Sequence, residues 1–454
     1  MKKNDRLWFK DYVNDYSNKA KKRRIIDWNS YLSGNHKILN EPNEMFNGKE
    51  LEVKRTIINI PKTINLFHKT YLLENNLQIT GEEEIASDYN KVYERGDFHS
   101  SNFKLLDTFI NHGEVYEFVY SDKKGIIRSH LFKPQYSYPV YNHKNEMESF
   151  VYHYTYGKVD YYEVYYSDFV ETYSTVGNDL LLTSRKPNAS GMLPIPYLRE
   201  VDTEDGIIKP DIEFYKSSID DLEYLIAKTH DAVYKFITGT LLIRGQMLTL
   251  PEGIKNRLAG FALNVDDNGD AEYIRNDVLV EAAKFLKQTY IEDILNTSET
   301  PAIALNQTSI DNISEESIRH FYKIADNKAS EHKRYLRNGF NLRHRAIRKL
   351  LELQGTSYSD DEFHSLKTNF QTLRPNNHKE QIEVMKLYRE EGAMSSKTIL
   401  EYNPYVTDSK VELERIKQEQ EEEKASQGKD ETVSDPMNSE TYIIEETGQE
   451  SVKV

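Results

Sequence analysis

A helical pattern from Ser314 to about Gln354 constrains this chain more than any other sequence feature. Apolar, small or aromatic side chains recur there at steps of three and four, the spacing of one helix face. They are Ile318, Phe321, Ala325, Ala329, His332 and Leu336. At 1.5 Å per residue such a helix runs on the order of 60 Å, and Gly339 is the expected position of a kink. The chain has 454 residues, more than one hydrophobic core usually organises, and this length predicts several packing units.

Two further helices precede the long one and are separated by a short β segment. The first begins near Ser217, where Asp220 completes a capping pair, and its apolar seam has a heptad-like spacing. The seam consists of Ile219, Leu222, Ile226, Thr229, Val233 and Phe236. The second runs from near Asn276 to Asn296 with one apolar face. Between them, residues 239–276 favour short strands with a hairpin turn at 266–270.

The first third of the chain is a mixed region that becomes dense in tyrosine. Between Gln135 and Tyr173 lie 11 of the 32 tyrosines, and residues 149–156 and 159–173 alternate Val, Tyr and Phe with polar side chains. Alternation with a period of two predicts antiparallel strands. A half-buried sheet with hydroxyls at its rim explains this composition, and a surface that stacks sugars or bases is the alternative.

Residues 295–314 join the second helix to the long one without a stable periodicity. The segment is polar at both ends and contains Pro301, and loops of this length without regular structure are usually functional. After Gly355 the pattern predicts a strand within 364–375 and two short helices within 379–406. The residues that follow have the composition of a disordered tail.

The charge of the chain is unevenly distributed. The net charge is −15, and residues 411–454 hold 13 acidic and 5 basic side chains, a net of −8. Residues 1–24 instead hold 9 basic and 3 acidic side chains. This amino-terminal cluster predicts either a solvated helix end or a patch for phosphates or a partner protein.

Composition narrows the class of protein. With 38% hydrophobic residues and a mean hydropathy of −0.72 the chain is too polar for a membrane protein, and with 11% aromatic residues it is too aromatic for a disordered one. The absence of cysteine excludes disulfides, thiolate zinc sites and cysteine nucleophiles. No apolar run reaches the roughly 20 residues of a membrane span, and the charged first residues do not resemble a signal peptide. We therefore expect a soluble, folded protein.

The motifs of common enzymes are absent from the sequence. It contains no P-loop, no GxGxxG after a strand, no GxSxG and no HExxH. His320 and His332 are separated by twelve residues rather than the four of a zinc helix, and the acidic runs at 266–270 and 359–362 are more typical of turns than of a magnesium site. We expect no catalytic residue, metal or cofactor. A metal-dependent nucleic-acid-processing enzyme and a tyrosine-rich carbohydrate-binding module are the alternatives.

Five stretches of sequence, taken in order, carry a family resemblance. They are YLSGNHKIL at 31–39, a helix and Leu-rich turn at 58–81, a Gly-aromatic strand with a proline turn at 110–142, the helix at 217–236, and the helical segment at 374–406 with its Ser-x-x-Thr-x-Leu pattern. No single stretch is diagnostic, but their order over about residues 25–420 resembles the portal proteins of tailed bacteriophages, of the type found in long-tailed phages of Gram-positive hosts. One departure is 311–322, where the family often has a Ser-Gly-x-Ala-Leu stretch.

The resemblance implies an α+β, mainly helical portal fold that forms rings. Its regions would be a wing at 1–210, a first stem helix at 211–238, a clip at 239–276, a second stem helix at 277–297, a tunnel loop at 298–312, a long kinked wing helix and strand at 313–373, crown helices at 374–424 and a disordered acidic tail at 425–454.

The resemblance also implies a function without catalysis. Portal proteins form a ring, commonly of twelve subunits, at one capsid vertex, and double-stranded DNA passes through the ring during packaging and ejection. The implied partners are the terminase large subunit, the major capsid and scaffolding proteins, and a head-completion or tail connector protein. The implied location is the virion, after assembly in the host cytoplasm and without a membrane.

Two sets of site residues follow from the resemblance. The tunnel loop would touch DNA through Ser298, Thr300, Asn306, Gln307, Thr308 and Ser309. This loop contains no Lys or Arg, which fits a contact that lets a polyanion slide. The stem would form the subunit interface through Leu222, Ile226, Val233 and Phe236.

Overall fold

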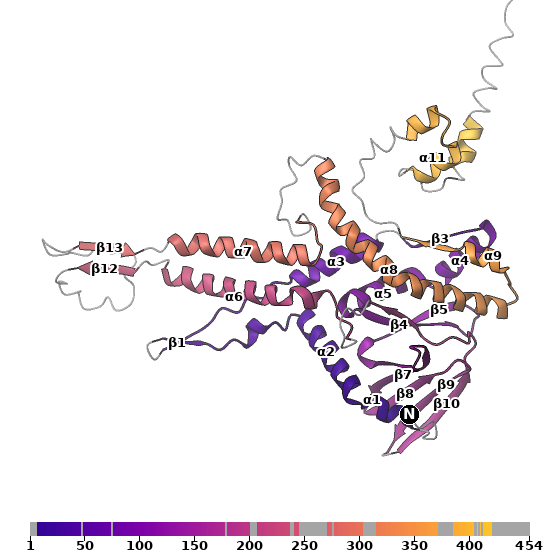
Figure 1. Ribbon diagram of the computed structural model, residues 1–454, viewed down its shortest axis with the longest axis horizontal. Helices are drawn as coiled ribbons and strands as arrows, with labels where there is room; N and C mark the ends of the chain where they lie inside the picture. Colours follow the sequence, from indigo (N-terminus) through magenta and orange to yellow (C-terminus); the bar gives the residue numbers. More distant parts are fainter. Residues whose placement is uncertain are drawn as a thin grey trace, which may run out of the picture. The chain divides into compact units, whose positions relative to one another are not determined.

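The computed structural model contains both helices and strands, and Figure 1 labels most of them. The structure describes residues 7–46, 49–73, 76–177, 179–199, 207–236, 240–244, 270–274, 277–302, 315–370, 385–403, 406, 409 and 412–419. The chain divides into two units, Met1–Arg374 and Pro375–Val454, which agrees with the prediction of several packing units.

The amino-terminal part of the first unit is mainly helical, with three short strands. Its elements are, in chain order, α1 (Trp8–Val13), α2 (Tyr16–Leu32), the 3-10 helix η1 (Lys37–Asn40), a hairpin of β1 (Glu44–Phe46) and β2 (Lys49–Leu51), α3 (Ile60–Leu73), β3 (Gln78–Thr80), α4 (Glu83–Arg95) and α5 (Phe98–His112). Asp15 caps α2, because its carboxylate accepts a hydrogen bond from the backbone N–H of Ser17 at 3.2 Å. The basic residues of the amino-terminal cluster therefore lie mostly on a capped helix.

The tyrosine-rich region is a five-stranded antiparallel sheet. Its strand order is β10 (Asp179–Pro187), β9 (Phe169–Val176), β8 (Val159–Tyr165), β7 (Met147–Tyr156) and β6 (Ser137–Tyr141), with the 3-10 helix η2 (Pro134–Tyr136) before β6. The predicted strands are confirmed. The rings of Tyr138, Tyr162 and Tyr173 are buried against Phe9 of α1, so these tyrosines form a core rather than a stacking surface.

A three-stranded sheet lies under the long helix. Its order is β11 (Ile195–Leu198), β4 (Glu114–Ser121) and β5 (Ile127–Phe132), and helix α8 (Glu315–Leu353) contacts β11 and β4. A fully buried ion pair fixes this contact: Arg343 Nε donates to Glu117 Oε2 at 2.8 Å, and the Tyr197 hydroxyl donates to the same oxygen at 2.6 Å. Because both charges of the pair are desolvated, removing either one leaves the other uncompensated.

Gly339 has a role that its helical position alone does not reveal. The α8 ribbon bends along its length (Figure 1), yet it is one uninterrupted helix of 39 residues. A Cβ at Gly339 would lie 2.2 Å from the ring of Tyr197, closer than any real contact. The absence of a side chain at Gly339 therefore allows α8 to lie against β11. This close packing is a second reason for glycine at the position where the sequence predicts a kink.

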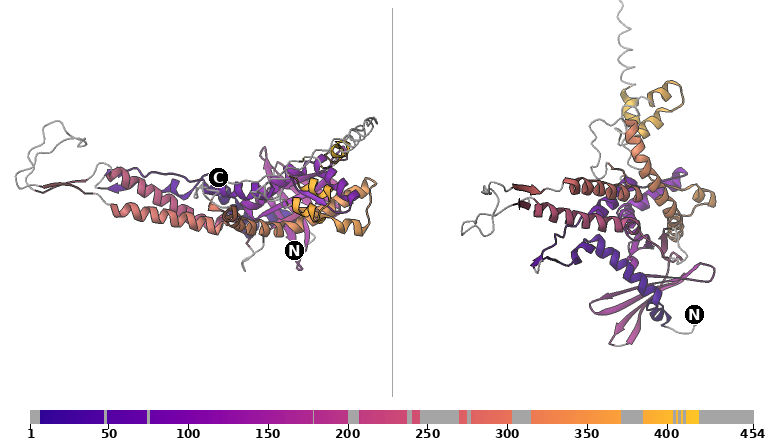
Figure 2. Two further views of the ribbon diagram at one scale, coloured as in Figure 1. Left: turned by 90° about the horizontal axis from the view of Figure 1, so that it is seen from above. Right: turned by 60° about the vertical axis from the view of Figure 1, so that its left-hand side comes forward.

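Two long helices lie side by side in both Figure 1 and Figure 2. They are α6 (Ile212–Phe236) and α7 (Asp277–Thr297), at the positions of the two predicted helices. The predicted capping pair is wrong, because α6 begins five residues before Ser217, and Ser217 and Asp220 lie inside the helix. Between the two helices in the chain, β12 (Thr240–Arg244) pairs antiparallel with β13 (Asp270–Ile274). The predicted hairpin turn lies almost entirely outside the described residues. The helix–strand–strand–helix order expected of a stem and clip is thus present.

The first unit closes with α9 (Asp360–Ser365) and β14 (Lys367–Asn369), and β14 pairs with β3. This pairing confirms the strand predicted after Gly355. In the second unit, residues 385–390 are helical and α11 (Ser396–Tyr402) is capped by Ser395, whose Oγ accepts from the Thr398 N–H at 3.2 Å. The predicted tail at 425–454 lies outside the described residues.

Candidate functional site

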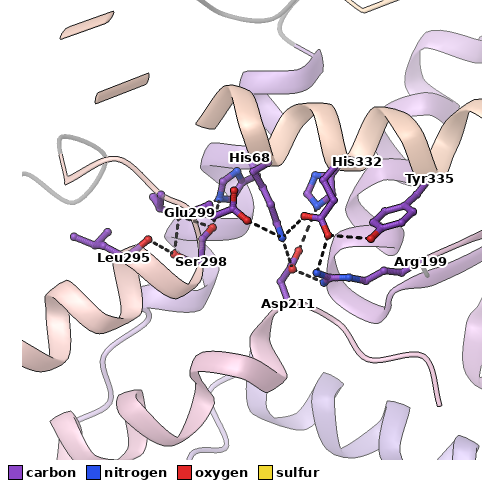
Figure 3. Close-up of polar contacts among 11 residues, drawn as sticks. His68, Arg199, Asp211, Leu295, Ser298, Glu299, His332 and Tyr335 are labelled. Atoms are coloured by element: carbon purple, nitrogen blue, oxygen red, sulfur yellow. Dashed lines mark hydrogen bonds and ion pairs between the residues drawn. The ribbon is translucent and has the colours of Figure 1, made fainter. Parts of the chain in front are cut away.

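Several distant segments meet where α6 begins and α7 ends (Figure 3). Arg199 follows β11, Asp211 precedes α6, Ser298 to Thr300 follow α7, and α3 and α8 supply the remaining side chains. We call this group the junction cluster. It consists of His68, Arg199, Asp211, Ser298, Glu299, Thr300, Lys328, Glu331, His332 and Tyr335.

Asp211 is the centre of the junction cluster. Its Oδ1 lies 2.8 Å from Lys328 Nζ and is also paired with the Arg199 guanidinium, and its Oδ2 lies 3.3 Å from His332 Nε2. Burial alone raises the pKa of the Asp211 carboxyl. The hydrogen bond from His332 and the charges of Lys328 and Arg199 outweigh burial and hold that pKa well below its ordinary value. Asp211 is therefore ionised, and its charge compensates the positive charges of Lys328 and Arg199.

Glu331 shares the two cations with Asp211. Its carboxylate accepts from Lys328 Nζ at 2.7 Å, from Arg199 at 3.2 Å and from the Tyr335 hydroxyl at 3.1 Å. Although burial raises the pKa of Glu331, these cations lower it below its usual range. Lys328 is only 4% exposed, so its charge is balanced by carboxylates rather than by water.

His68 joins the cluster to the end of α7. Its Nε2 lies 3.0 Å from the Ser298 carbonyl oxygen and 3.0 Å from Thr300 Oγ1. Burial, reinforced by the nearby His332, lowers the pKa of His68 to about 3. The imidazole is therefore neutral near pH 7 and donates a hydrogen bond from Nε2 to the carbonyl of Ser298.

The end of α7 is closed by its own backbone. The N–H of Thr300 donates to the carbonyl of Leu295 at 2.9 Å, and the N–H of Glu299 donates to that of Asn296 at 3.2 Å. These two bonds form a Schellman motif, in which the residue at the position of Glu299 is left-handed and usually glycine. Glu299 has a φ of 52° and its carboxylate lies 3.9 Å from Lys328.

Two predicted tunnel-loop residues lie inside this arrangement. Ser298 and Thr300 are 2% and 3% exposed, and the Ser298 hydroxyl donates to Thr300 Oγ1 at 2.8 Å. The prediction that these two side chains touch DNA does not fit their burial, because their polar atoms are taken up by His68 and by each other. Asn306, Gln307, Thr308 and Ser309 lie outside the described residues.

The predicted stem residues have mixed environments. Leu222 is 1% exposed and packs with Ile219 of α6 and Ile294 of α7, and Ile226 is partly buried against the same group. Leu222 therefore serves the core of its own subunit. Val233 and Phe236 belong to α6, but their side chains lie outside the described residues.

An acidic residue of the same helix is also internal. Glu223 is buried, with its Oε1 2.6 Å from His36 Nδ1 and accepting from the Ile58 backbone N–H at 2.7 Å. The ring of His36 stacks on Tyr31 with 4.0 Å between centroids. This contact anchors α6 to the segment after α2, so the Glu223 carboxylate is not part of the outer surface of α6.

Several apolar side chains of α6 and α7 are exposed within one subunit. Phe285 is 71% exposed, Val280 47% and Leu286 41%, all on α7, and Tyr224 of α6 is 45% exposed. The sequence predicts the interface seam on α6 alone, whereas the described residues also expose large apolar side chains on α7, of which Phe285 is the most exposed. The signal that could have found it is Phe285 next to Leu286 among charged neighbours.

No three His, Asp or Glu side chains among the described residues are placed to share a metal ion. None of the helices in the described ranges is both long and apolar enough to cross a bilayer. The junction cluster combines two cations, three carboxylates and the neutral His68, and its contacts join α3, the start of α6, the end of α7 and α8.

Comparison with known proteins identifies the family. Residues 13–426 match the model of the family described as phage portal protein, SPP1 Gp6-like. A comparison with curated proteins gives no match.

Solved structures give weaker similarities. One, described as the neck of an empty GTA particle computed with C6 symmetry, has a TM-score of 0.44 and 12% identity, and the match covers 75% of this chain and 88% of that chain. A second, described as the virion of a native gene transfer agent particle, has a TM-score of 0.43 and 11% identity, with coverage of 75% and 88%. The family assignment rests on the family model, which spans nearly the whole chain: this protein belongs to the SPP1 Gp6-like family of phage portal proteins.

Proposed function

We propose that this portal subunit forms, in a ring of twelve copies, the channel through which double-stranded DNA enters and leaves the capsid. Family membership makes the chain a structural subunit of a ring at the portal vertex of a virion and not an enzyme. The observation that carries the channel proposal is the junction cluster, because it fixes the end of α7 and the body of α8 on either side of residues 303–314.

Fewer residues of the tunnel loop are proposed to contact DNA than the sequence predicted. Asn306, Gln307, Thr308 and Ser309 are proposed to contact the sliding DNA, and Ser298 and Thr300 are proposed to anchor the loop. Residues 298–312 contain no Lys or Arg, so they can exchange weak hydrogen bonds with phosphates without holding them.

The subunit contact is proposed to use the exposed apolar face of α7. Phe285 and Val280 are exposed within one subunit, and a head-to-tail interface that closes into a ring would cover them in every copy. Ile226, Val233 and Phe236 of α6 remain proposed members of this interface, and Leu222 supports it from the core.

Specific partners are part of the same proposal. We expect the terminase large subunit, the major capsid and scaffolding proteins, and a head-completion or tail connector protein to dock on the ring, with assembly in the host cytoplasm. The support is the family, whose members form part of a capsid.

The ring contact is tested by Phe285→Asp, with Phe285→Leu as the matched control. The aspartate places a charge on the proposed apolar contact, whereas leucine keeps the contact apolar. Negative-stain microscopy should show rings with a central hole for the wild type and for Phe285→Leu, and few or none for Phe285→Asp. Rings of normal yield from Phe285→Asp would exclude α7 as the interface.

The channel is tested by deleting residues 302–308, with deletion of residues 432–438 in the acidic tail as a control of equal length. The loop deletion should leave rings intact and lower the yield of DNA-filled heads, and the tail deletion should leave both unchanged. A normal yield of filled heads from the loop deletion would refute the DNA contact.

A further inference from the structure

The outer face of α8 carries a row of positive charge in an acidic protein. Between Lys323 and Lys349 the chain has nine Lys or Arg and two Asp or Glu, although its net charge is −15. Five of these cations are exposed: Lys323, Arg334, Arg337, Arg345 and Lys349. Their positions follow the period of the helix, so they share one side of α8, with the amides of Asn327, Asn338 and Asn341 between them. We call this the α8 basic face.

The cations of the α8 basic face have no anionic partner in the described part of the chain. The acidic residues of α8 whose side chains are described are already engaged: Asp326 accepts from the Tyr71 hydroxyl at 2.8 Å, Glu331 pairs with Lys328 at 2.7 Å, and Glu352 pairs with Arg348 at 3.0 Å. Surfaces normally intersperse charges of both signs. A row of one sign whose neighbouring acids are paired elsewhere is complementary to an external polyanion.

We propose that the α8 basic face binds the phosphate backbone of double-stranded DNA that is held rather than sliding. The 26 steps from Lys323 to Lys349 give the face a length of about 39 Å at 1.5 Å per residue, which matches about 12 base pairs of duplex at 3.4 Å each. Arginine and asparagine are both suited to phosphate oxygens. The residues of this face are the opposite of those in 298–312, which lack any cation, so the two surfaces fit different DNA contacts. The inference takes from the proposed function only the presence of DNA.

The test compares Arg334→Gln/Arg337→Gln/Arg345→Gln with Lys123→Gln/Lys124→Gln/Lys144→Gln in the full chain. Both triple variants remove three exposed positive charges, and the control lysines lie in turns of the two sheets. Glutamine is also a good helix former, so α8 should persist. Fluorescence anisotropy measures binding of a labelled duplex of about 12 base pairs at several salt concentrations, and negative-stain microscopy scores rings separately.

We expect the α8 variant to bind the duplex more weakly and to reduce the slope of log K against log salt by up to about 2.7, which is 0.9 for each of three lost phosphate contacts. The lysine control and an Arg-to-Lys triple at the same α8 positions should bind as the wild type does. Equal binding by the glutamine variant, or an equal loss in the lysine control, overturns the inference. Loss of rings in the α8 variant alone also overturns the inference, because the face would then be a contact between subunits. The same holds if the α8 variant loses binding to poly-glutamate but keeps binding to DNA, because the face would then bind an acidic polypeptide. Failure of the ring in every chain, wild type included, would refute the proposed function and not the DNA contact of α8.

Discussion

Replacing Asp211 by asparagine removes the charge on which the junction cluster depends. The isosteric amide keeps the shape of the side chain but leaves Lys328 and Arg199 with Glu331 as their close anion. Breaking a buried pair by removing one partner costs about 3–5 kcal/mol. Because Glu331 still contacts both cations, we expect the lower end, about 3 kcal/mol.

This cost converts into a melting temperature for the unit that contains the cluster. Unfolding entropy is about 2.1 cal/mol/K per residue, which for the unit Met1–Arg374 gives about 0.8 kcal/mol/K. A loss of about 3 kcal/mol should then lower the Tm of that unit by about 4 °C. Differential scanning calorimetry at pH 7 measures this change. Asp361→Asn, at an exposed position of α9, is the control and should change the Tm by less than about 1 °C.

The pH dependence gives an independent check. The folded pKa of Asp211 lies below its unfolded value, so its contribution is present above about pH 4 and is lost as the pH falls through the folded pKa. The Tm difference between wild type and Asp211→Asn should be constant from pH 7 to about pH 5 and shrink below about pH 4. A difference under about 1 °C at pH 7, or one that grows in acid, would refute the assignment of a stabilising anion.

Three further changes test other contacts. His68→Gln should reduce the loss of stability in acid. The folded pKa of His68 is about 3, so the neutral imidazole of the wild type stabilises the fold less as the pH falls below the unfolded value of about 6.5. Urea unfolding at pH 7 and pH 5 measures this loss, and an equal loss of unfolding free energy in both proteins would contradict the prediction. Gly339→Ala should destabilise by about 1–3 kcal/mol despite its better helix propensity, since the new methyl overlaps the Tyr197 ring, whereas Asn338→Ala on the exposed side should not; a Tm rise in Gly339→Ala would show that the ring can move aside. Truncation before Ala425 should leave the ring intact in size-exclusion chromatography, and loss of the ring would make the acidic tail a structural arm.

The periodicity of apolar residues predicted the long helices and the tyrosine-rich strands close to their observed positions. The three long helices were predictable because their apolar residues follow a single face for many turns, and the tyrosine-rich strands because alternation over eight residues is typical of a half-buried strand. The strands β4 and β11 and the helices α4 and α5 were not resolved by pattern. In β4 the first four side chains in a row are buried, so the strand has no alternation of buried and exposed residues. Gly339 could be recognised as unusual, but its contact with Tyr197 joins positions 142 residues apart and has no local signal.

The site was harder to predict than the fold for a physical reason. Ser298 and Thr300 are polar, and a polar side chain in a loop can find its hydrogen-bond partner in water, in DNA or in the protein. Only the tertiary structure shows that His68, 230 residues away, is that partner. Asp211 likewise gave no signal, because its cations come from segments that the sequence does not place together. The α8 basic face did have a signal, the local excess of Lys and Arg, which the overall acidity of the chain obscures.

The closed end of α7 has a mechanical consequence. A helix whose last carbonyls are free can unwind residue by residue when the chain beyond it is pulled. In this subunit the carbonyls of Leu295 and Asn296 accept from the backbone N–H groups of Thr300 and Glu299, and His68 of α3 is hydrogen-bonded to Ser298 and Thr300. Tension on the chain after Thr300 would therefore be transmitted to α3 through His68 and to α8 through the Glu299–Lys328 pair, without unwinding α7.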